Sequence, residues 1–292
     1  MIQYPRMFHR KKFKLRLPSR TLILGERTLL MGVLNVTPDS FSDGGLYFDA
    51  GAAVARALEI QSAGADILDI GGESTRPGAA AISAEEELAR ILPVLNKLRG
   101  QLTIPISIDT SKATVAEAAA EAGAEIINDV TALRADARIA EVARRYKLPL
   151  ILMHMRGTPR TMQQKPFARD AMRDITSGLK KATASALRSG VAKSQIVLDP
   201  GFGFGKSYEQ NFEFLARLPE LARLGYPLLI GTSRKSFLGR ALGGAPESDR
   251  IWATAATVAA SILQGAHIVR VHDVAEMAQV ARVTDVIASR KT

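Results

Sequence analysis

Short apolar runs, each ending in polar or charged residues, recur eight times along the chain. They occupy residues 29–34, 67–70, 104–108, 125–127, 148–153, 196–198, 227–230 and 267–271. Apolar runs of this length that alternate with longer amphipathic stretches predict βα units and a parallel sheet. Eight units suit an α/β fold in which the sheet closes as a (β/α)8 TIM barrel. The polar residues that end the runs are then expected to converge on one mouth of the barrel.

The stretches between the runs have helical periodicity and recognisable ends. Residues 49–63, 83–98, 112–122 and 273–288 are rich in Ala, Leu and Glu, and both Ser83/Glu86 and Asp273/Glu276 have capping-box spacing. The junctions at residues 64–67, 123–126 and 265–268 each begin with Gly-Ala, which predicts a glycine C-cap followed by a strand. We also expect an N-terminal β-hairpin over residues 21–33, turning at Gly25-Glu26 and closing the barrel floor.

Composition narrows the class of protein. The chain has 292 residues, 47% of them hydrophobic, with no cysteine and no apolar stretch long enough to span a bilayer. The absence of cysteine fits a reducing cytoplasm. Of the net charge of +10, residues 1–20 supply +7, because they hold seven Lys or Arg residues and no acid. We assign residues 1–20 to a basic extension that need not be ordered, and residues 21–292 to a single domain. A basic arm that binds nucleic acid is the competing interpretation.

Polar side chains at three strand ends indicate recognition of a planar heterocycle. Asp109, Asn128 and Asp199 each end an apolar run, where a carboxylate or amide needs donors or acceptors from a partner. The segment Gly201–Ser207 fits neither the Walker A nor the dinucleotide spacing, and we expect a flexible edge whose Phe202 and Phe204 pack against a ring. Helix capping is the alternative role for Asp109, and His154 is expected to be an interior histidine.

A second group of side chains indicates an anionic substrate. Lys235, Arg270, His272 and Arg76 lie at predicted strand ends, and in many barrels the last two loops hold a phosphate. Arginine meets two anionic oxygens at once. Asn35 together with a pyrophosphate would suit Mg²⁺, which takes few protein ligands.

Long motifs carry a family resemblance over residues 22–288. Residues 31–45 (MGVLNVTPDSFSDGG) and 69–78 (DIGGESTRPG) resemble the two signatures of bacterial dihydropteroate synthases. Residues 107–110, 127–130, 198–204, 232–239 and 270–274 continue the likeness. The resemblance implies condensation of a dihydropterin pyrophosphate with p-aminobenzoate, with Mg²⁺ as cofactor, sulfonamides as competitors and a homodimer as the assembly. No nucleic-acid or membrane partner is implied.

The resemblance also implies roles for particular residues. The pterin would be held by Asp109, Asn128, Asp199 and Lys235, with Met153 and Phe204 beside it. The pyrophosphate would be held by Asn35, Arg270 and His272, with Mg²⁺ on Asn35. The p-aminobenzoate site would be formed by Phe41, Thr75, Arg76, Pro77 and Ser233, with Lys235. Asp109, Lys235, Arg270 and His272 would carry the chemistry, a dissociative substitution under loops that exclude water. The main alternative is a pterin-dependent corrinoid methyltransferase, which has no pyrophosphate to hold.

Overall fold

Eight parallel strands form a barrel in the computed structural model of the chain, which describes residues 10–37, 49–76, 78–158, 160–162 and 169–290. In the order of the sheet the strands are β8 (Ile196–Asp199), β7 (Leu150–Met153), β6 (Ile126–Asp129), β5 (Ile106–Asp109), β4 (Ile67–Gly71), β3 (Leu29–Asn35), β10 (Ile268–Val271) and β9 (Leu229–Ile230). A parallel bridge between Leu198 and Leu228 joins β8 to the segment before β9. The predicted barrel and all eight predicted strands are therefore confirmed.

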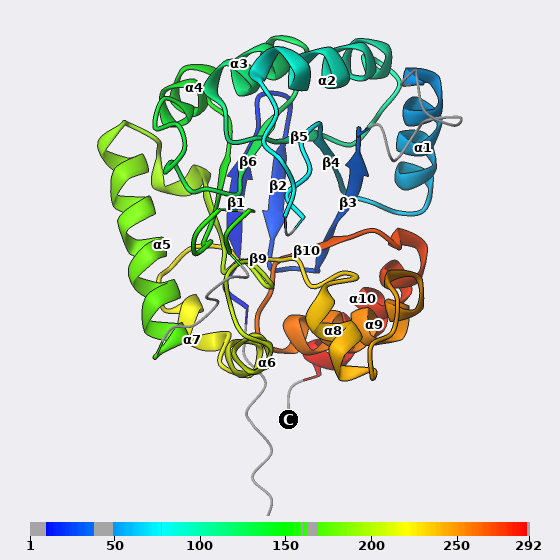
Figure 1. The fold of residues 1–292 in the computed structure, drawn as a ribbon, viewed down its shortest axis with the longest axis vertical. Helices are drawn as coiled ribbons and strands as arrows, with labels where there is room; N and C mark the ends of the chain where they lie inside the picture. The colour runs from blue at the N-terminus through cyan, green and yellow to red at the C-terminus, as the bar shows by residue number, and fades with distance from the viewer. Residues whose placement is uncertain (1–9, 38–48, 77, 159, 163–168, 291–292) are drawn as a thin grey trace, which may run out of the picture.

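Helices connect and surround the strands (Figure 1). They are α1 (Ala50–Ser62), α2 (Ala84–Leu98), α3 (Ala113–Glu121), α4 (Ile139–Tyr146), α5 (Ala171–Arg188), α6 (Tyr208–Ala216), α7 (Pro219–Ala222), α8 (Ser236–Ala241), α9 (Ile251–Leu263) and α10 (Val274–Ser289), with 3-10 turns at Lys193–Gln195 and Glu247–Arg250. Ser83 caps α2 by accepting from the Glu86 amide, as predicted. The capping box predicted at Asp273 is wrong, because the Asp273 carboxylate pairs with Arg234 instead of the helix backbone.

The N-terminal hairpin exists, but it lies earlier in the chain than we predicted. Strands β1 (Phe13–Arg16) and β2 (Thr21–Leu24) pair antiparallel, so the turn falls between them and not at Gly25-Glu26. The predicted second strand is β3, whose two edges are already taken by parallel β4 and β10. Residues 13–16 therefore belong to the barrel fold and not to a separate extension. Residues 1–9 lie outside the described part.

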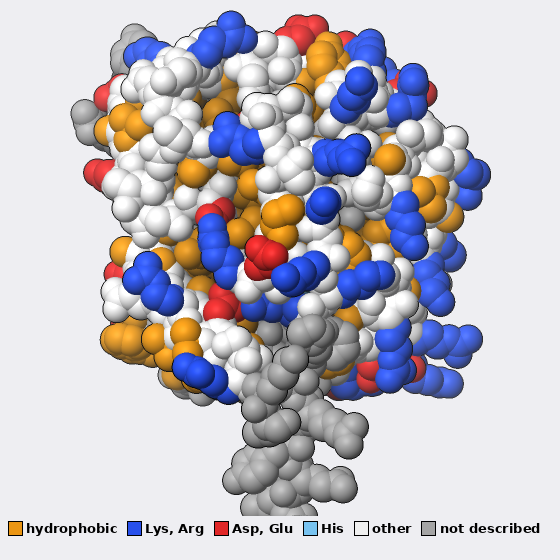
Figure 2. Space-filling model, turned by 180° about the vertical axis from the view of Figure 1, so that it is seen from behind, with side chains coloured by type: hydrophobic (Ala, Val, Ile, Leu, Met, Phe, Trp, Pro, Cys, Tyr) orange, Lys and Arg blue, Asp and Glu red, His pale blue; other side chains and the backbone are white. Residues whose placement is uncertain are grey.

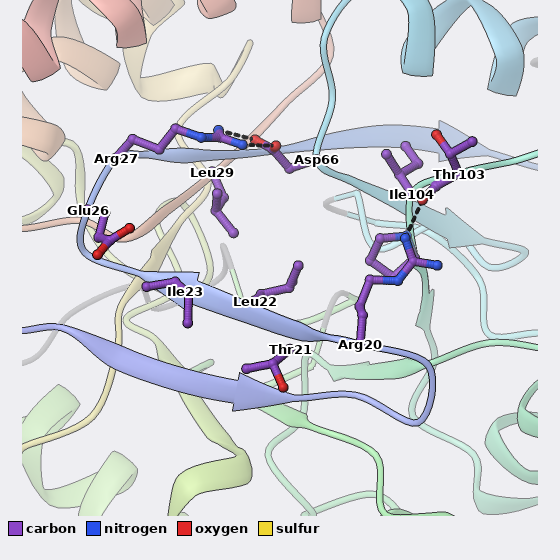
Figure 3. Close-up of a pocket in the computed structure, with 11 residues that line it drawn as sticks. Arg20, Thr21, Leu22, Ile23, Glu26, Arg27, Leu29, Asp66, Thr103 and Ile104 are labelled. Atoms are coloured by element: carbon purple, nitrogen blue, oxygen red, sulfur yellow. Dashed lines mark hydrogen bonds and ion pairs between the residues drawn. The ribbon is translucent and has the colours of Figure 1, made fainter.

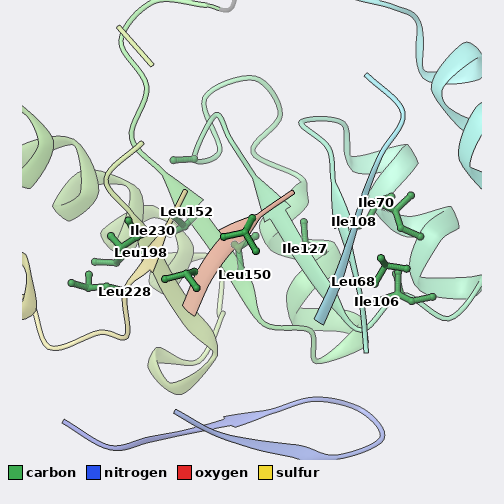
Figure 4. Packing of buried hydrophobic residues seen from close by; sticks show 14 of the residues in the cluster. Leu68, Ile70, Ile106, Ile108, Ile127, Leu150, Leu152, Leu198, Leu228 and Ile230 are labelled. Atoms are coloured by element: carbon green, nitrogen blue, oxygen red, sulfur yellow. The ribbon is translucent and has the colours of Figure 1, made fainter. Parts of the chain in front are cut away.

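The hairpin closes the floor because its apolar residues face the barrel interior. Leu15, Leu17 and Leu24 are buried in a cluster with inward residues of the barrel strands. These are Leu29 and Met31 of β3 and, from other strands, Ile67, Ile126, Ile151, Val197, Leu229 and Ile268. The next residue along each strand points outward and packs under the helices, as Leu68, Ile127, Leu152 and Leu198 do (Figure 4). Side chains alternate between the two faces of a strand. The residue two positions beyond each floor residue therefore points into the barrel again, nearer its mouth.

Ion pairs and hydrogen bonds fix the hairpin to the underside of the barrel (Figure 3). Arg27 forms a bidentate ion pair with Asp66, with N–O distances of 2.8 Å and 2.5 Å. Arg20 donates a hydrogen bond to the carbonyl oxygen of Thr103. A cavity of about 490 Å³ lies between these groups. It is at the amino ends of the strands, away from the polar mouth.

The surface carries its positive charge in a dispersed form. Figure 2 shows Lys and Arg side chains scattered over one face, with acidic and hydrophobic side chains among them. Among the described residues, the helices are all too short or too polar to cross a bilayer. The cytoplasmic location stays a prediction.

Candidate active site

The mouth of the barrel is lined by inward residues that lie two positions beyond its floor. This spacing brings Asp69, Asp109, Asn128, Met153, Asp199 and Arg270 into the barrel at the carboxyl ends of their strands. All except Asp69 line one cleft of about 490 Å³, together with Asn35, Thr75, Arg76, Phe204, Ser233, Lys235 and His272. The structure thus brings together the candidate residues that sequence analysis assigned to one site. Phe41 and Pro77 lie outside the described residues.

Arg270 lies at the centre of the charged part of this cleft. Its Nε donates to Asp69 Oδ2 at 2.6 Å, and its Nη2 donates to Asp109 Oδ2 at 2.9 Å. The same Asp69 oxygen accepts from Asn128 Nδ2 at 3.1 Å. Strands β4, β5, β6 and β10 are therefore joined by one network of hydrogen bonds, and the orientations of Asp109 and Asn128 depend on Arg270 and Asp69.

Asp69 is a residue whose role sequence analysis missed. We quoted it within a motif but gave it no role, although it interrupts the apolar run between Leu68 and Ile70. Its side chain is completely buried, and its Oδ1 has no hydrogen-bond partner within the described part of the chain. A carboxylate inside an apolar strand requires a cationic partner. That rule was the available signal, but it did not identify the partner as Arg270.

Burial shifts the pKa values of three groups that line the cleft, Asp109, Asp199 and Lys235. It raises the pKa of Asp109 to about 7, with the Arg270 cation opposing the shift. It raises the pKa of Asp199 to about 6, against the hydrogen bond from the Gly201 amide. Burial, with repulsion from Arg270, lowers the pKa of Lys235 to about 8. The proton occupancy of the site therefore changes close to neutral pH.

The glycine-rich segment is a tightly packed loop, which corrects our expectation of a flexible edge. Gly201 has a φ of +71°, and a Cβ there would lie 2.0 Å from the carbonyl oxygen of His154. Phe204 faces the cleft, with the Lys235 ammonium 4.0 Å from its ring centre. Phe202 also borders the cleft, but it is 1% exposed and packs against Phe214 with ring centres 3.9 Å apart. Of the two predicted aromatic platforms, Phe202 is therefore mainly a core residue.

His272 is oriented by the loop that follows β9. Ser233 Oγ accepts from the His272 amide at 3.2 Å and lies 3.0 Å from His272 Nδ1. The hydroxyl has one hydrogen and two acceptor lone pairs, so Ser233 can bond to either tautomer of the ring. Burial lowers the pKa of His272 to about 3, which keeps the ring neutral. His272 is therefore a neutral imidazole at pH 7, with one N–H donor and one acceptor nitrogen.

The Ser233 loop is held in place by Arg234. This residue has a φ of +58°, which is unusual for a residue other than glycine. Its guanidinium pairs with Asp273, and its carbonyl accepts from Arg250 at 2.9 Å. Ser233 and Lys235, the residues before and after Arg234, both line the cleft. The strained backbone places them there.

Three ion pairs lie on the side of the cleft formed by the loop after β4. Arg76 lies 3.3 Å from Glu247, near the cleft rim. Below it, Lys112 pairs with both Glu73 and Glu87 at 2.5 Å. Sequence analysis did not find this triad, in which Glu87 is fully buried, because its members come from different elements of the fold.

Two further predictions concern histidine and metal. His154 is nearly buried and lies 3.3 Å from Asp174 on the far side of β7, outside the residues that line the cleft. The predicted interior position is confirmed. Asn35 lines the cleft. No cluster of three His, Cys, Asp or Glu residues suited to a metal ion occurs among the described residues.

Comparison with known proteins identifies the family. Residues 31–272 match the family described as pterin binding enzyme. The chain is 48% identical over 263 residues to the dihydropteroate synthase of Synechocystis, with 90% of this chain and 91% of the relative covered. This chain belongs to the dihydropteroate synthase family. The resemblance that the sequence motifs indicated is therefore confirmed.

Solved structures of the family have the same fold. A dihydropteroate synthase from Clostridium difficile, solved in the presence of pteroic acid, superimposes with a TM-score of 0.86 at 47% identity, covering 92% of this chain and 99% of that one. The Yersinia pestis enzyme in a sulfonamide drug complex gives a TM-score of 0.89 at 43% identity, covering 95% and 100%.

Proposed function

We infer that the protein is a dihydropteroate synthase, a transferase that condenses 6-hydroxymethyl-7,8-dihydropterin pyrophosphate with p-aminobenzoate to give 7,8-dihydropteroate and pyrophosphate. The observation that carries this inference is one cleft that holds carboxylates and an amide next to an arginine, a lysine and a neutral histidine. The chain that forms this cleft is 48% identical to a dihydropteroate synthase. Carboxylates suit the N–H groups of a pterin, and the cationic side suits a pyrophosphate.

The pterin is proposed to lie against Asp109, Asn128, Asp199 and Lys235, with Met153 and Phe204 on its faces. Asn128 lines the cleft, and its Oδ1 lacks a partner among the described residues, so this polar wall is incompletely satisfied. A heterocycle with several N–H groups on one edge would supply donors to this wall. Phe204 and Met153 are both buried in one apolar cluster beside it, which provides a surface for a planar ring.

The pyrophosphate is proposed to lie between Arg270, His272 and Asn35. Arg270 presents a guanidinium beside Asp109, and His272 presents a neutral imidazole to the same cleft. Asn35 supplies a single amide oxygen beside these groups, which fits Mg²⁺ because that ion keeps waters and takes most of its ligands from substrate phosphates. When bound, Mg²⁺ would neutralise charge on the departing pyrophosphate.

The arylamine is proposed to enter beside Thr75, Arg76 and Ser233, with Phe41 and Pro77 completing its site. In the substitution, the bond between the pterin methylene and the pyrophosphate oxygen breaks first. The arylamine nitrogen then bonds to the methylene carbon and loses a proton. Positive charge develops on the pterin in between, and the Asp109 carboxylate is placed to stabilise it. Sulfonamides, which occur in a family structure, are expected to compete with p-aminobenzoate.

The test is pyrophosphate release from the pterin substrate and Mg²⁺, measured with and without p-aminobenzoate. Release that requires the arylamine and matches dihydropteroate formation is expected. Pterin binding without release in either mixture would contradict the proposal and favour the corrinoid methyltransferase. Replacing Asn35 by Ala is expected to raise the Mg²⁺ concentration needed for half-maximal rate.

A further inference from the structure

Lys206 is a buried ammonium for which the proposed mechanism has no use. Its side chain is 3% exposed. Its Nζ donates to the carbonyl oxygens of His154 at 2.8 Å, Pro200 at 2.8 Å and Gly201 at 2.7 Å. An ammonium has three N–H donors, so these bonds use all of them. No carboxylate of a described residue lies within ion-pair distance of Nζ. Moving an ammonium out of water costs several kcal/mol, which these carbonyls must offset.

The three carbonyls come from the ends of two neighbouring strands. His154 follows β7, whereas Pro200 and Gly201 follow β8. The loop passes so close to β7 that only glycine fits at position 201. Three carbonyl oxygens that converge at this distance repel one another unless a cation lies between them. Lys206 is therefore the group that allows the loop after β8 to pack on the end of β7.

One peptide group links Lys206 to the substrate cleft. The carbonyl oxygen of Pro200 accepts from Lys206, and the amide of Gly201, in the same peptide plane, donates to Asp199 Oδ1 at 2.7 Å. The two ends of a trans peptide point in opposite directions. A cation that fixes the oxygen therefore also fixes the N–H that orients the Asp199 carboxylate. Lys206 itself is not among the residues that line the cleft.

We propose that Lys206 is a positioning residue for pterin recognition, which acts through the Pro200–Gly201 peptide on Asp199. This proposal rests on the proposed function, since it assigns Asp199 to the pterin. The glycine spacing of the loop excluded a Walker A site, and in the structure the Lys206 ammonium points into the protein. Its ligands are this chain's own carbonyls.

The experiment is a double-mutant cycle read by equilibrium binding of the pterin pyrophosphate without p-aminobenzoate. Lys206→Met keeps the side-chain length and removes the donors, and it is expected to weaken pterin binding at least tenfold. At saturating pterin, the KM for p-aminobenzoate is expected to change less than threefold. In an Asp199→Ala background, Lys206→Met is expected to weaken pterin binding by less than a further threefold, because the carboxylate through which Lys206 acts is then missing.

The matched control is Lys112→Met, which removes a partly buried lysine from another side of the barrel. It is expected to leave pterin affinity within threefold of wild type. Wild-type pterin affinity in Lys206→Met would overturn the proposal. It would also be overturned if the loss of affinity in the double variant equalled the product of the losses in the two single variants. If Lys206→Met does not fold, as judged by its thermal transition, Lys206→Gln replaces it in the cycle. Failure of the proposed function is distinguishable, because the wild-type enzyme would then release no pyrophosphate.

Discussion

At the scale of single residues, the chemistry of the cleft depends on two groups whose pKa values burial has moved toward neutrality. The pKa of Asp109 is raised to about 7, and that of Lys235 is lowered to about 8. The proposed mechanism requires Asp109 as the carboxylate and Lys235 as the ammonium. Both requirements are met together only over a narrow range of pH.

The first prediction is a narrow bell-shaped pH profile of kcat/KM for the pterin pyrophosphate. The rate falls below about pH 7 as Asp109 gains a proton, and it falls above about pH 8 as Lys235 loses one. Asp109→Asn is expected to remove the acid limb near 7 and to lower the maximum about 100-fold. Wild-type turnover in folded Asp109→Asn protein would contradict the electrostatic role.

The second prediction concerns Asp69, which holds Arg270. Asp69→Asn removes one of the two carboxylates on the guanidinium, and it is expected to lower kcat/KM for the pterin substrate by at least about tenfold, or 1.4 kcal/mol. Asp66→Asn is the matched control, because Asp66 also pairs with an arginine but lies on the barrel floor. Equal losses in the two variants would show that Asp69 acts only on stability.

At the scale of elements, the hairpin β1–β2 is the part of the fold that the sequence placed incorrectly. Lys14 and Arg16 made residues 13–16 resemble a basic tail, yet they alternate with the buried Leu15 and Leu17. Arg10 also belongs to the fold, since it pairs with Asp285 near the end of α10. The basic residues drew attention to net charge, although the alternation of charged and apolar residues over residues 14–17 is typical of a strand.

The third prediction follows from comparing two truncations. Deleting residues 1–20 removes β1 and its buried leucines, each worth about 2 kcal/mol, and it is expected to lower the Tm by about 10 °C relative to deletion of residues 1–9. Differential scanning calorimetry measures this difference. Equal melting temperatures would show that the hairpin does not stabilise the barrel.

At the scale of the whole molecule, apolar side chains remain exposed on the outer faces of α9 and α10. Trp252 is 78% exposed, Val283 61% and Val286 50%. Exposed apolar surface of this kind on helices is typical of an interface. We propose that these two helices contribute to a homodimer.

The fourth prediction is a solution mass of twice 31.4 kDa, measured by light scattering. The double variant Val283→Lys/Val286→Lys is expected to be monomeric at the same concentration, because it places charge in the interface. Ile23→Lys, at an exposed apolar position on the floor hairpin, is the control and should remain dimeric. A monomeric wild type would overturn the proposal.

The sequence by itself determined the strands, the barrel and most of the residues at its mouth. Apolar runs of strand length and glycine caps are local signals, and a parallel barrel turns the end of every strand to the same side. Asp109, Asn128 and Asp199 could therefore be assigned to one site without knowing any distance between them. The family motifs then specified the substrates.

Only the tertiary structure decided which of these groups meet. Arg270 joins Asp69 and Asp109 across more than 150 residues of sequence, and Asp273 pairs with Arg234 instead of capping its own helix. Phe202 enters the core while Phe204 faces the cleft. The physical reason is that a buried charge takes whichever partner the closed barrel brings within reach. Spacing along the chain specifies the face of a strand, but not the side chain opposite it.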